Sequence, residues 1–526
     1  MNQRRRFRPT TVSALAAMIA CGSLAATLPK RRALGFIEQD RFRKVPIVMV
    51  VFDEFPLATL MNAKGKIDGN LFPNFARIQR DSVWFRNATT VSSFTAKAMP
   101  SLLTGRYPQH LTDPAARRSS IFNLLGGAYN IRAKEEKFSE LCPSNACEDS
   151  ATPATERLAQ RYKRIFPGAR GDIFLRFLGY LRDVDKPRFY FMHLAMPHSP
   201  WRYLPTGQAY PQIRPIPGEY DSPGKGKEWL KDQWLVTQAY QRHLLQTALL
   251  DRQVGVLINK LKQKDIYGRS LFIVTADHGI AYGPGASKRV IVKKTIGHIS
   301  AVPLFVKLPR QKRGRISDRP LQTIDLVPTI ADILNLSSSP QGIDGISGFR
   351  NRFPRHRRRT TEGLEIGFRG LAKYEVAKMK YGMFNKKNRT LDLFLLGPGG
   401  TRLFVGRPVD DMNLAPPGTT TVSVNDLETH ENADPNAPLL PALLEGRLNG
   451  VEPDAGEKVA IAMNGRVVAV TRTYSKDGLA HFYAMLPPRW FGTPPNEVEF
   501  YLVEDTASET LVPLPHVDSP AEYISD

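Results

Sequence analysis

Cysteine is scarce in this chain of 526 residues, which contains three. Zinc-finger spacing, a helix-turn-helix pattern and a ribonucleoprotein signature are also missing, so we expect no nucleic acid among its partners. Two of the cysteines, Cys142 and Cys147, bracket "PSNA" in a loop-like segment. This spacing favours a short disulfide over a metal site, because no further metal ligands lie nearby, and a disulfide in turn indicates an oxidising compartment.

Long hydrophobic runs are rare as well. The main candidate, residues 11–29, is a modest apolar stretch of borderline length for a membrane span, and it follows the basic segment "MNQRRRFRP". The pattern predicts export, with the segment cleaved as a signal, lipidated at Cys21 or retained as a membrane anchor. We therefore expect the protein on the periplasmic or extracellular face of the membrane.

Negative charge is in short supply. The chain has 73 Lys and Arg against 50 Asp and Glu, a net charge of +23 and a pI near 9.9. Such a protein attracts anions, so the expected partner is an anionic small-molecule, lipid or glycan substrate, with an acidic membrane surface as a second candidate. The dense basic run at residues 349–359 is a solvated linker or a contact with such a surface. The sequence gives no indication of the oligomeric state.

The length exceeds what one hydrophobic core usually supports, so we expect more than one domain. The predicted division is a signal or membrane anchor with its linker at 1–44, an α/β domain at 45–348, a basic linker and irregular segment at 349–454, and a C-terminal β domain at 455–526.

Three predicted buried strands end in polar side chains. The segment "VPIVMVVFDEFP" ends in Asp53 and Glu54, and "SLFIVTADHG" ends in Asp277 and His278. A third, "RFYFMHLAMPHSPW", closes on two histidines, of which we expect His193 to be packed rather than catalytic. Continuous apolar runs are typical of parallel strands, and ligands of open α/β sheets bind at the carboxyl ends of their strands.

Segments with helical periodicity, such as residues 71–81 and 233–261, lie between these strands. The alternation predicts an α/β fold with a doubly wound, mostly parallel sheet and helices on both faces. Near residue 455 the pattern changes to short alternating segments, and "MNGR" between two apolar runs predicts a hairpin. We therefore expect a smaller C-terminal β-sandwich-like domain.

The polar strand ends together suggest a metal site. Asp53, Asp277 and His278 offer two carboxylates and an imidazole, a set suited to Zn²⁺ or another divalent transition metal. The hydroxyl-rich stretch at residues 89–95 could supply a nucleophile, because metal coordination lowers the pKa of a hydroxyl.

Several motifs, in this order, are similar to those of the alkaline phosphatase superfamily, in particular its sulfatase and phosphoethanolamine transferase–lipoteichoic acid synthase branch. They are "FPNFARIQRDSVWFRNATT", "MPSLLTGRYP", "MPHSPW", "VTADHG" and "TIDLVPTIADIL" with "GIDG". The resemblance runs from about residue 45 to residue 345. Separate motifs in a shared order are more specific than any one motif.

The resemblance implies a role for each matching residue. Thr95 would be the nucleophile, at the position of the residue that sulfatases convert to formylglycine, with Thr90, Ser92 and Ser93 as alternatives if the loop register differs. His198 would bind the anionic oxygens of the substrate or protonate the leaving group. The implied metal ligands are Asp53, Glu54, Thr95, Asp277 and His278, and the implied substrate-binding residues are His298 and Lys97.

The sequence also departs from the sulfatase pattern. Lys97, Ala98 and Met99 stand where sulfatases have the proline, serine and arginine that direct formylglycine formation, which argues against a formylglycine enzyme. We expect Pro100 to limit how early the following helix can begin. The later basic run, formed by Lys288, Arg289, Lys293 and Lys294, is interpreted as exposed loop charge rather than as anion ligands.

Together these features predict a metal-dependent hydrolase or transferase that acts on phosphate esters or phosphodiesters, its substrate being a cell-envelope lipid or glycan. The expected metal is zinc, with manganese, calcium and magnesium as alternatives. Two other functions remain open. One is a sulfatase-like sulfuric ester hydrolase without formylglycine, and the other is a catalytically inactive envelope binding protein.

Overall fold

A computed structural model describes residues 44–135, 153–162, 164–182, 187–213, 215–223, 226–336, 342–351, 360–365 and 392–518, together with a few single positions between them. Residues 38–526 form one compact unit. Within the described ranges, we find no helix with both the length and the apolar character needed to cross a membrane.

Several predictions fall outside these ranges. Residues 1–43, with Cys21, are not described, so cleavage, lipidation and anchoring stay predictions. The same holds for the disulfide, because Cys147 lies outside the described residues, and for residues 355–359 of the basic run. The division into four segments also remains a prediction.

The predicted α/β sheet is present and has seven strands in the order β3-β4-β1-β7-β8-β2-β9. Strands β3, β4, β1 and β7 run parallel to one another, while β8 pairs antiparallel with both β7 and β2, so the sheet is mostly parallel as expected. The strands are β1 (Ile47–Asp53), β2 (Val83–Phe85), β3 (Asn130–Glu135), β4 (Arg188–Pro197), β7 (Leu271–Ala276), β8 (Leu304–Lys307) and β9 (Arg315–Ser317).

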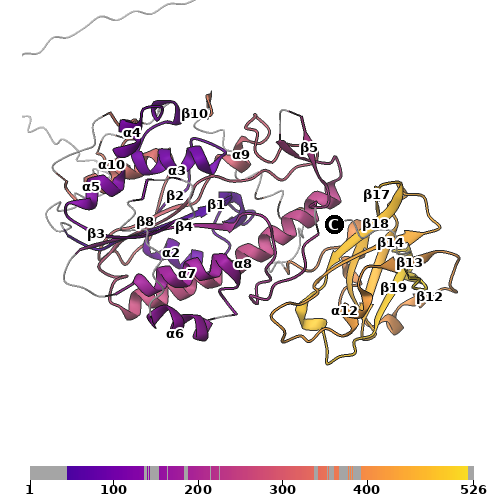
Figure 1. Cartoon of the computed structure of the whole chain (residues 1–526). Coiled ribbons are helices and arrows are strands. Elements are labelled where there is room, and N and C mark those ends of the chain that lie inside the picture. Colours follow the sequence, from indigo (N-terminus) through magenta and orange to yellow (C-terminus); the bar gives the residue numbers. More distant parts are fainter. Residues whose placement is uncertain are drawn as a thin grey trace, which may run out of the picture. The chain divides into compact units, whose positions relative to one another are not determined.

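Helices cover both faces of the sheet (Figure 1), which confirms the predicted doubly wound arrangement. One face carries α3 (Thr95–Thr104), α5 (Ile121–Gly126) and α10 (Leu326–Ile333), and the other carries α2 (Pro73–Asp81), α7 (Gly168–Tyr180) and α8 (Gln233–Gln263). Alternate side chains of β1 serve the two cores: Met49 belongs to the first and Val50 to the second. This burial on both faces explains why β1 is a continuous apolar run.

Helix α3 begins at Thr95 and contains Pro100, so the expectation that Pro100 would delay the helix start is wrong. A proline in this position removes the hydrogen bond to the carbonyl of Ala96, one turn earlier. Ala96 is exposed, so water can satisfy that carbonyl, and the first turn can form. Thr95 therefore lies in the first turn of a ten-residue helix.

The end of α3 offers a test of how this helix is held against the sheet. Gly105 ends it in the left-handed conformation, with φ 72°, and a Cβ there would lie 3.3 Å from both the Ile324 carbonyl oxygen and the Val327 Cβ. We expect Gly105→Ala to lower the free energy of unfolding by about 1–2 kcal/mol, because an L-residue resists this conformation.

Chemical denaturation would measure this change, with Gly126→Ala as the control. Gly126 ends α5, has no left-handed φ, and has no atom within 4 Å of its hypothetical Cβ. Equal unfolding free energies for the two variants would contradict the explanation.

The C-terminal region is β-rich, as expected, with a five-stranded sheet ordered β12-β20-β19-β15-β16 and a four-stranded sheet ordered β13-β14-β18-β17. Side chains of both sheets, among them Leu444 and Ile461, share one core, as in a β-sandwich. The hairpin at "MNGR" is confirmed, because Met463 pairs with Arg466 across it. The strands are β12 (Asn413–Leu414), β13 (Thr421–Val424), β14 (Leu443–Asn449), β15 (Lys458–Met463), β16 (Arg466–Arg472), β17 (Tyr474–Lys476), β18 (Leu479–Met485), β19 (Val498–Asp505) and β20 (Thr510–Pro513).

Three of these strands, β12, β13 and β14, lie in the stretch 349–454 that we expected to be a basic linker and irregular segment. The two-residue β12 is too short to show an alternating pattern. Strand β14 does alternate in burial, but its sequence "LLEGRLN" carries a glycine and two charged residues, which obscure that alternation. Pairing with β18 along its length is what makes it a strand.

Candidate functional site

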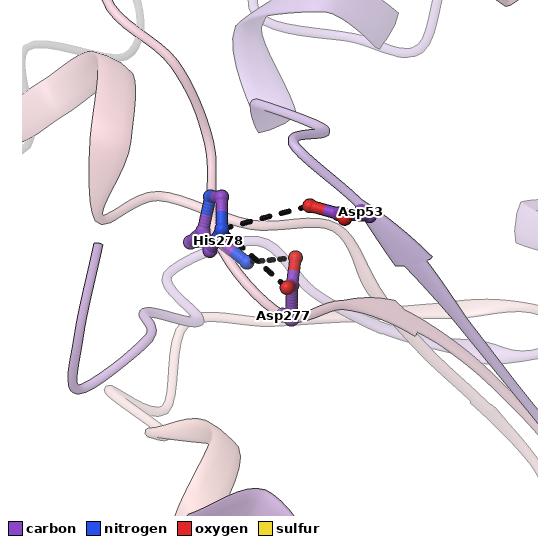
Figure 2. A group of neighbouring side chains, drawn as sticks. All are labelled: Asp53, Asp277 and His278. Carbon is purple, nitrogen blue, oxygen red and sulfur yellow. Dashed lines mark hydrogen bonds and ion pairs between the residues drawn. The ribbon is translucent and has the colours of Figure 1, made fainter. Parts of the chain in front are cut away.

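The carboxyl ends of neighbouring parallel strands bring the predicted metal ligands together. Asp53 is the last residue of β1, and Asp277 directly follows β7, with its N–H donating to the Phe52 carbonyl at 3.0 Å. Figure 2 shows Asp53, Asp277 and His278 pointing toward one another. Their ligand atoms all lie within 4.8 Å of one another, and all three side chains are buried. These three predicted metal ligands therefore form one cluster.

The electrostatics of the cluster suit a cation. Burial, followed by the charge of Asp53, raises the pKa of Asp277 well above its usual value, and burial also raises the pKa of Asp53. Oxygen Oδ2 of Asp277 is buried and accepts no hydrogen bond from the described residues. A divalent ion at this point would relieve both the repulsion between the carboxylates and the unsatisfied oxygen.

The third member of the cluster is held as a neutral imidazole. Burial and the neighbouring Arg289 lower the pKa of His278 well below its usual value. Its Nδ1 lies 3.0 Å from the carbonyl oxygen of Gly279, so Nδ1–H can donate there and leave the lone pair on Nε2. Two carboxylates and one neutral imidazole fit a divalent metal ion.

Thr95 lies beside this cluster. Its Oγ1 is 3.1 Å from Nε2 of His278 and 3.4 Å from Oδ1 of Asp53. The preceding loop is anchored through Thr89, whose N–H donates to the Leu321 carbonyl at 3.0 Å. Among the hydroxyl residues of this loop, Thr95 is therefore the one that lies against the predicted metal ligands.

The alternative hydroxyls are engaged elsewhere. Both Ser92 Oγ and Ser93 Oγ donate to Oε1 of Glu362, at 3.0 and 2.6 Å, while Thr90 Oγ1 donates to the Ser92 carbonyl at 3.1 Å. Glu362 belongs to a short turn between β10 (Thr360–Thr361) and β11 (Leu364–Glu365). These hydrogen bonds give the other hydroxyls a role in shaping the loop that precedes Thr95.

Glu54, predicted as a metal ligand, pairs with an arginine in the structure. Its Oε1 accepts from Nε of Arg289 at 2.9 Å, and its Oε2 accepts from the Ser199 N–H at 3.1 Å. Burial alone would raise the pKa of Glu54, but the charges of Arg289 and His198 hold this pKa well below its usual value. Glu54 is therefore a buried, ionised carboxylate next to the Asp53–Asp277–His278 cluster rather than a member of it.

Arg289 is the site residue that the sequence analysis assigned to exposed loop charge. Its guanidinium also contacts Nε2 of His278 at 2.8 Å, Nε2 of His198 at 3.0 Å and the carbonyl of Ser93 at 2.7 Å. It therefore touches the loop that precedes Thr95 and the ends of three strands at once. Such a cation is well placed to bind an oxyanion.

The exposed-charge interpretation is confirmed for Lys293 and Lys294 and wrong for Lys288 and Arg289. Lys288 is buried, pairs with Glu219 at 2.9 Å and lies over the Trp229 ring. A run of charges in sequence carries no information on which members fold inward. The available signal was the position of this run between His278 and His298, both of which were predicted site residues.

His198 follows β4 and is partly exposed, with 30% of its side-chain surface accessible. Its backbone is held from two helices, because the carbonyl of His198 accepts from Arg170 of α7 at 2.7 Å and from Gln246 of α8 at 3.1 Å. Its Nε2 is 3.8 Å from Oε2 of Glu54. The structure thus places His198 at the rim of the cluster.

Two further predicted residues, His298 and Lys97, make no direct contact of this kind with the cluster. His298 lies on α9 (Ile296–Ile299), where burial lowers its pKa to about 4, and its imidazole makes no hydrogen bond or ion pair with Asp53, Asp277 or His278. Lys97 is the third residue of α3 and is exposed.

His193, which we expected to be packed, is buried within β4. Its Nε2 lies 4.0 Å from Oδ2 of Asp277, so it also lines the cluster. An apolar strand sequence does not distinguish a packed histidine from one beside a site, because both face inward.

Comparisons with known proteins identify the family of this chain. Residues 47–336 match the family model described as Sulfatase. Among curated proteins, N-acetylglucosamine-6-sulfatase of Bos taurus is 27% identical over 189 residues, 34% of this chain and 33% of the relative. Endo-4-O-sulfatase of Bacteroides thetaiotaomicron is 24% identical over 179 residues, 33% of this chain and 34% of the relative. The chain thus matches about a third of the length of these relatives.

Among solved structures, the phosphonate monoester hydrolase of Agrobacterium radiobacter has a TM-score of 0.43 and 17% identity, with 58% of this chain and 76% of that chain covered. The family match, by contrast, runs from β1 to the end of α10 and includes Asp53, Thr95, His198, Asp277 and His278. Members of that family are metal-dependent, in agreement with the ligand set. Because the match covers more than half of the 526 residues, the chain belongs to the sulfatase family, within the alkaline phosphatase superfamily.

Proposed function

We propose that this protein is a metal-dependent hydrolase or transferase that acts on phosphate esters or phosphodiesters, with Thr95 as its nucleophile. The observation that carries the proposal is the position of Oγ1 of Thr95, 3.1 Å from Nε2 of His278 and 3.4 Å from Oδ1 of Asp53. A hydroxyl beside a carboxylate and an imidazole of a metal-binding set is the arrangement expected of an activated alcohol nucleophile.

Asp53, Asp277 and His278 would hold the ion, and we propose zinc, with manganese, calcium or magnesium as alternatives. A divalent ion held there would lower the pKa of a nearby hydroxyl and offset negative charge on the substrate. Glu54 is assigned a different role from the one implied by the family resemblance, because its carboxylate neutralises Arg289.

The reaction proposed for the chain's own groups has two parts. Oxygen Oγ1 of Thr95 attacks phosphorus, its proton passes to the Asp53 carboxylate 3.4 Å away, and the bond from phosphorus to the leaving oxygen breaks. His198, at the exposed rim, donates a proton to that leaving oxygen, and Arg289 binds the non-bridging oxygens. Water or a second alcohol then attacks the phosphothreonine and gives its proton to His198, while the departing Thr95 oxygen regains its proton from Asp53. This step releases phosphate or a new ester and restores the Thr95 hydroxyl.

A sulfuric ester hydrolase without formylglycine is the second candidate. The matched relatives favour it, because their names, N-acetylglucosamine-6-sulfatase and Endo-4-O-sulfatase, describe sulfatases. Thr95 cannot be converted to formylglycine. A formyl group is formed from a thiol or from a primary alcohol, and the threonine side chain has neither. His278 in the cluster and Thr95 as nucleophile favour the phosphoryl reaction through family resemblance.

The location of the protein and its natural substrate are proposed from the sequence and not from the geometry of the site. We infer that the protein is exported to the periplasmic or extracellular face, with residues 1–44 as a signal or membrane anchor. The net charge of +23 supports an anionic lipid or glycan of the cell envelope as the substrate.

The test is a substrate screen with purified, metal-loaded protein. Initial rates are measured on p-nitrophenyl phosphate, bis-p-nitrophenyl phosphate and p-nitrophenyl sulfate at equal concentration. We expect turnover of one of the two phosphate substrates to exceed that of the sulfate ester by about tenfold or more. A preference for the sulfate ester would instead assign the second candidate, and no turnover of any ester would favour an inactive binding protein.

A further inference from the structure

A strongly charged hollow lies away from the catalytic cluster. Its volume is about 540 Å³, a size typical of small-ligand sites. Three helical segments form it, namely α6 (Pro153–Tyr162), the end of α7 and the end of α8. We call it the α6–α8 hollow, and its described lining residues are Arg157, Leu158, Arg161, Gly179, Leu181, Arg182, Lys260 and Lys264.

Five of these eight lining residues are cationic, and no carboxylate is among the lining residues that the structure describes. Across the described part of the chain, none of the five side chains forms an ion pair with an acidic residue, although many surface cations of this protein do. Burial, and then the charges of Lys264 and Arg161, lower the pKa of Lys260. The cations are therefore close enough to repel one another, and a bound anion would relieve that repulsion.

The hollow is separated from the catalytic cluster by the length of α7. Arg170, in the first turn of α7, donates to the carbonyl of His198 at the catalytic edge of the sheet. Gly179, near the other end of the helix, lines the hollow. Nine residues of α-helix span about 14 Å. The cations of the hollow are thus too far away to contact a group that is reacting at Thr95.

We propose that the α6–α8 hollow binds a small polyanion that carries two or more phosphate or sulfate groups. Arg157 and Arg161 offer forked donors that match the oxygens of such groups, and Lys260 and Lys264 add point charges. Leu158 and Leu181 supply an apolar wall for the part of the ligand that bears the anionic groups. The ligand could be an inorganic oligophosphate or a sulfated sugar, since both have the same oxyanion chemistry.

Isothermal titration calorimetry on the full chain tests this proposal with two probes, sodium tripolyphosphate and a trisulfated heparin disaccharide. The variant Arg161→Ser with Lys264→Ser removes two charges from the hollow. The matched control, Lys64→Ser with Lys66→Ser, removes two exposed charges from a turn after α1 (Leu57–Leu60). Circular dichroism checks that both variants fold, and Arg157→Gln alone replaces the first variant if it does not.

We expect at least one probe to bind the wild type, and the dissociation constant to rise about tenfold in the hollow variant, which corresponds to ~1.4 kcal/mol. The control variant should change the dissociation constant by less than about twofold, because it alters only the net charge of the protein. The probe that binds more tightly identifies the source of the ligand. Binding of neither probe, or an equal loss in the control variant, would overturn the proposal.

Discussion

Asp277→Ala protein is expected to lose the divalent ion that the wild type retains through purification. Asp277 contributes one of two carboxylates to a buried cluster whose third member is a neutral imidazole, so its removal leaves only Asp53 and His278. We expect metal affinity to fall by more than about 100-fold, because loss of even a supporting residue around a metal site costs 10–100-fold. Elemental analysis of wild type and variant, per mole of chain, measures the change.

The control for this experiment is Asp221→Ala, which removes an exposed carboxylate that pairs with Lys227 at 3.1 Å. It should retain the ion. Wild-type protein that is metal-free and takes up no ion after incubation with zinc or manganese would refute the proposed metal-dependent reaction and favour the binding-protein alternative. The identity of the retained ion would also decide between zinc and the other metals.

The second large effect is expected at Thr95, the proposed nucleophile. Thr95→Ala should lower kcat on the preferred ester by about three orders of magnitude or more, because the covalent route requires the hydroxyl oxygen. Thr95→Ser keeps an oxygen at the same position and should retain a measurable part of the activity. Both variants should also keep the metal ion, since Asp53, Asp277 and His278 remain in place.

A direct readout complements the rates. Acid quenching during turnover, followed by mass spectrometry of the peptide that contains Thr95, should reveal phosphothreonine in the wild type and not in Thr95→Ala. Ser93→Ala is the matched control, because the Ser93 hydroxyl donates to Glu362 instead of lying beside the cluster. Full activity in Thr95→Ala, with loss in Ser93→Ala, would move the nucleophile to Ser93 and contradict the proposal.

Much of the candidate site could be predicted because its residues end strands. The apolar runs before Asp53 and Asp277 are long enough to identify as buried parallel strands, and parallel neighbours place their carboxyl ends at one edge. The order of the motifs then identified the family, which the match over residues 47–336 confirms. Thr95 was predicted from its spacing to the following "LLTGR" segment, and it lies beside the cluster.

Other features had no reliable local signal. Arg289 is one cation among several in a loop, and it enters the site because Glu54, 235 residues earlier in the chain, offers a buried carboxylate. Glu54 itself follows Asp53 directly, so adjacency suggested a second metal ligand, whereas the fold directs its side chain to Arg289. The five cations of the α6–α8 hollow come from three separate helical segments and were not recognised as a group.

The sequence by itself therefore determined strands β1, β4 and β7, the family and the cluster of Asp53, Asp277 and His278, because each depends on residues that are close in sequence or on parallel strand order. Only the tertiary structure decided which charges face inward and that Ser92 and Ser93, the alternatives to Thr95, donate to Glu362 instead. The physical reason is that burial of a charge is set by its partners, and the partners of Arg289 and of Ser93 come from distant segments.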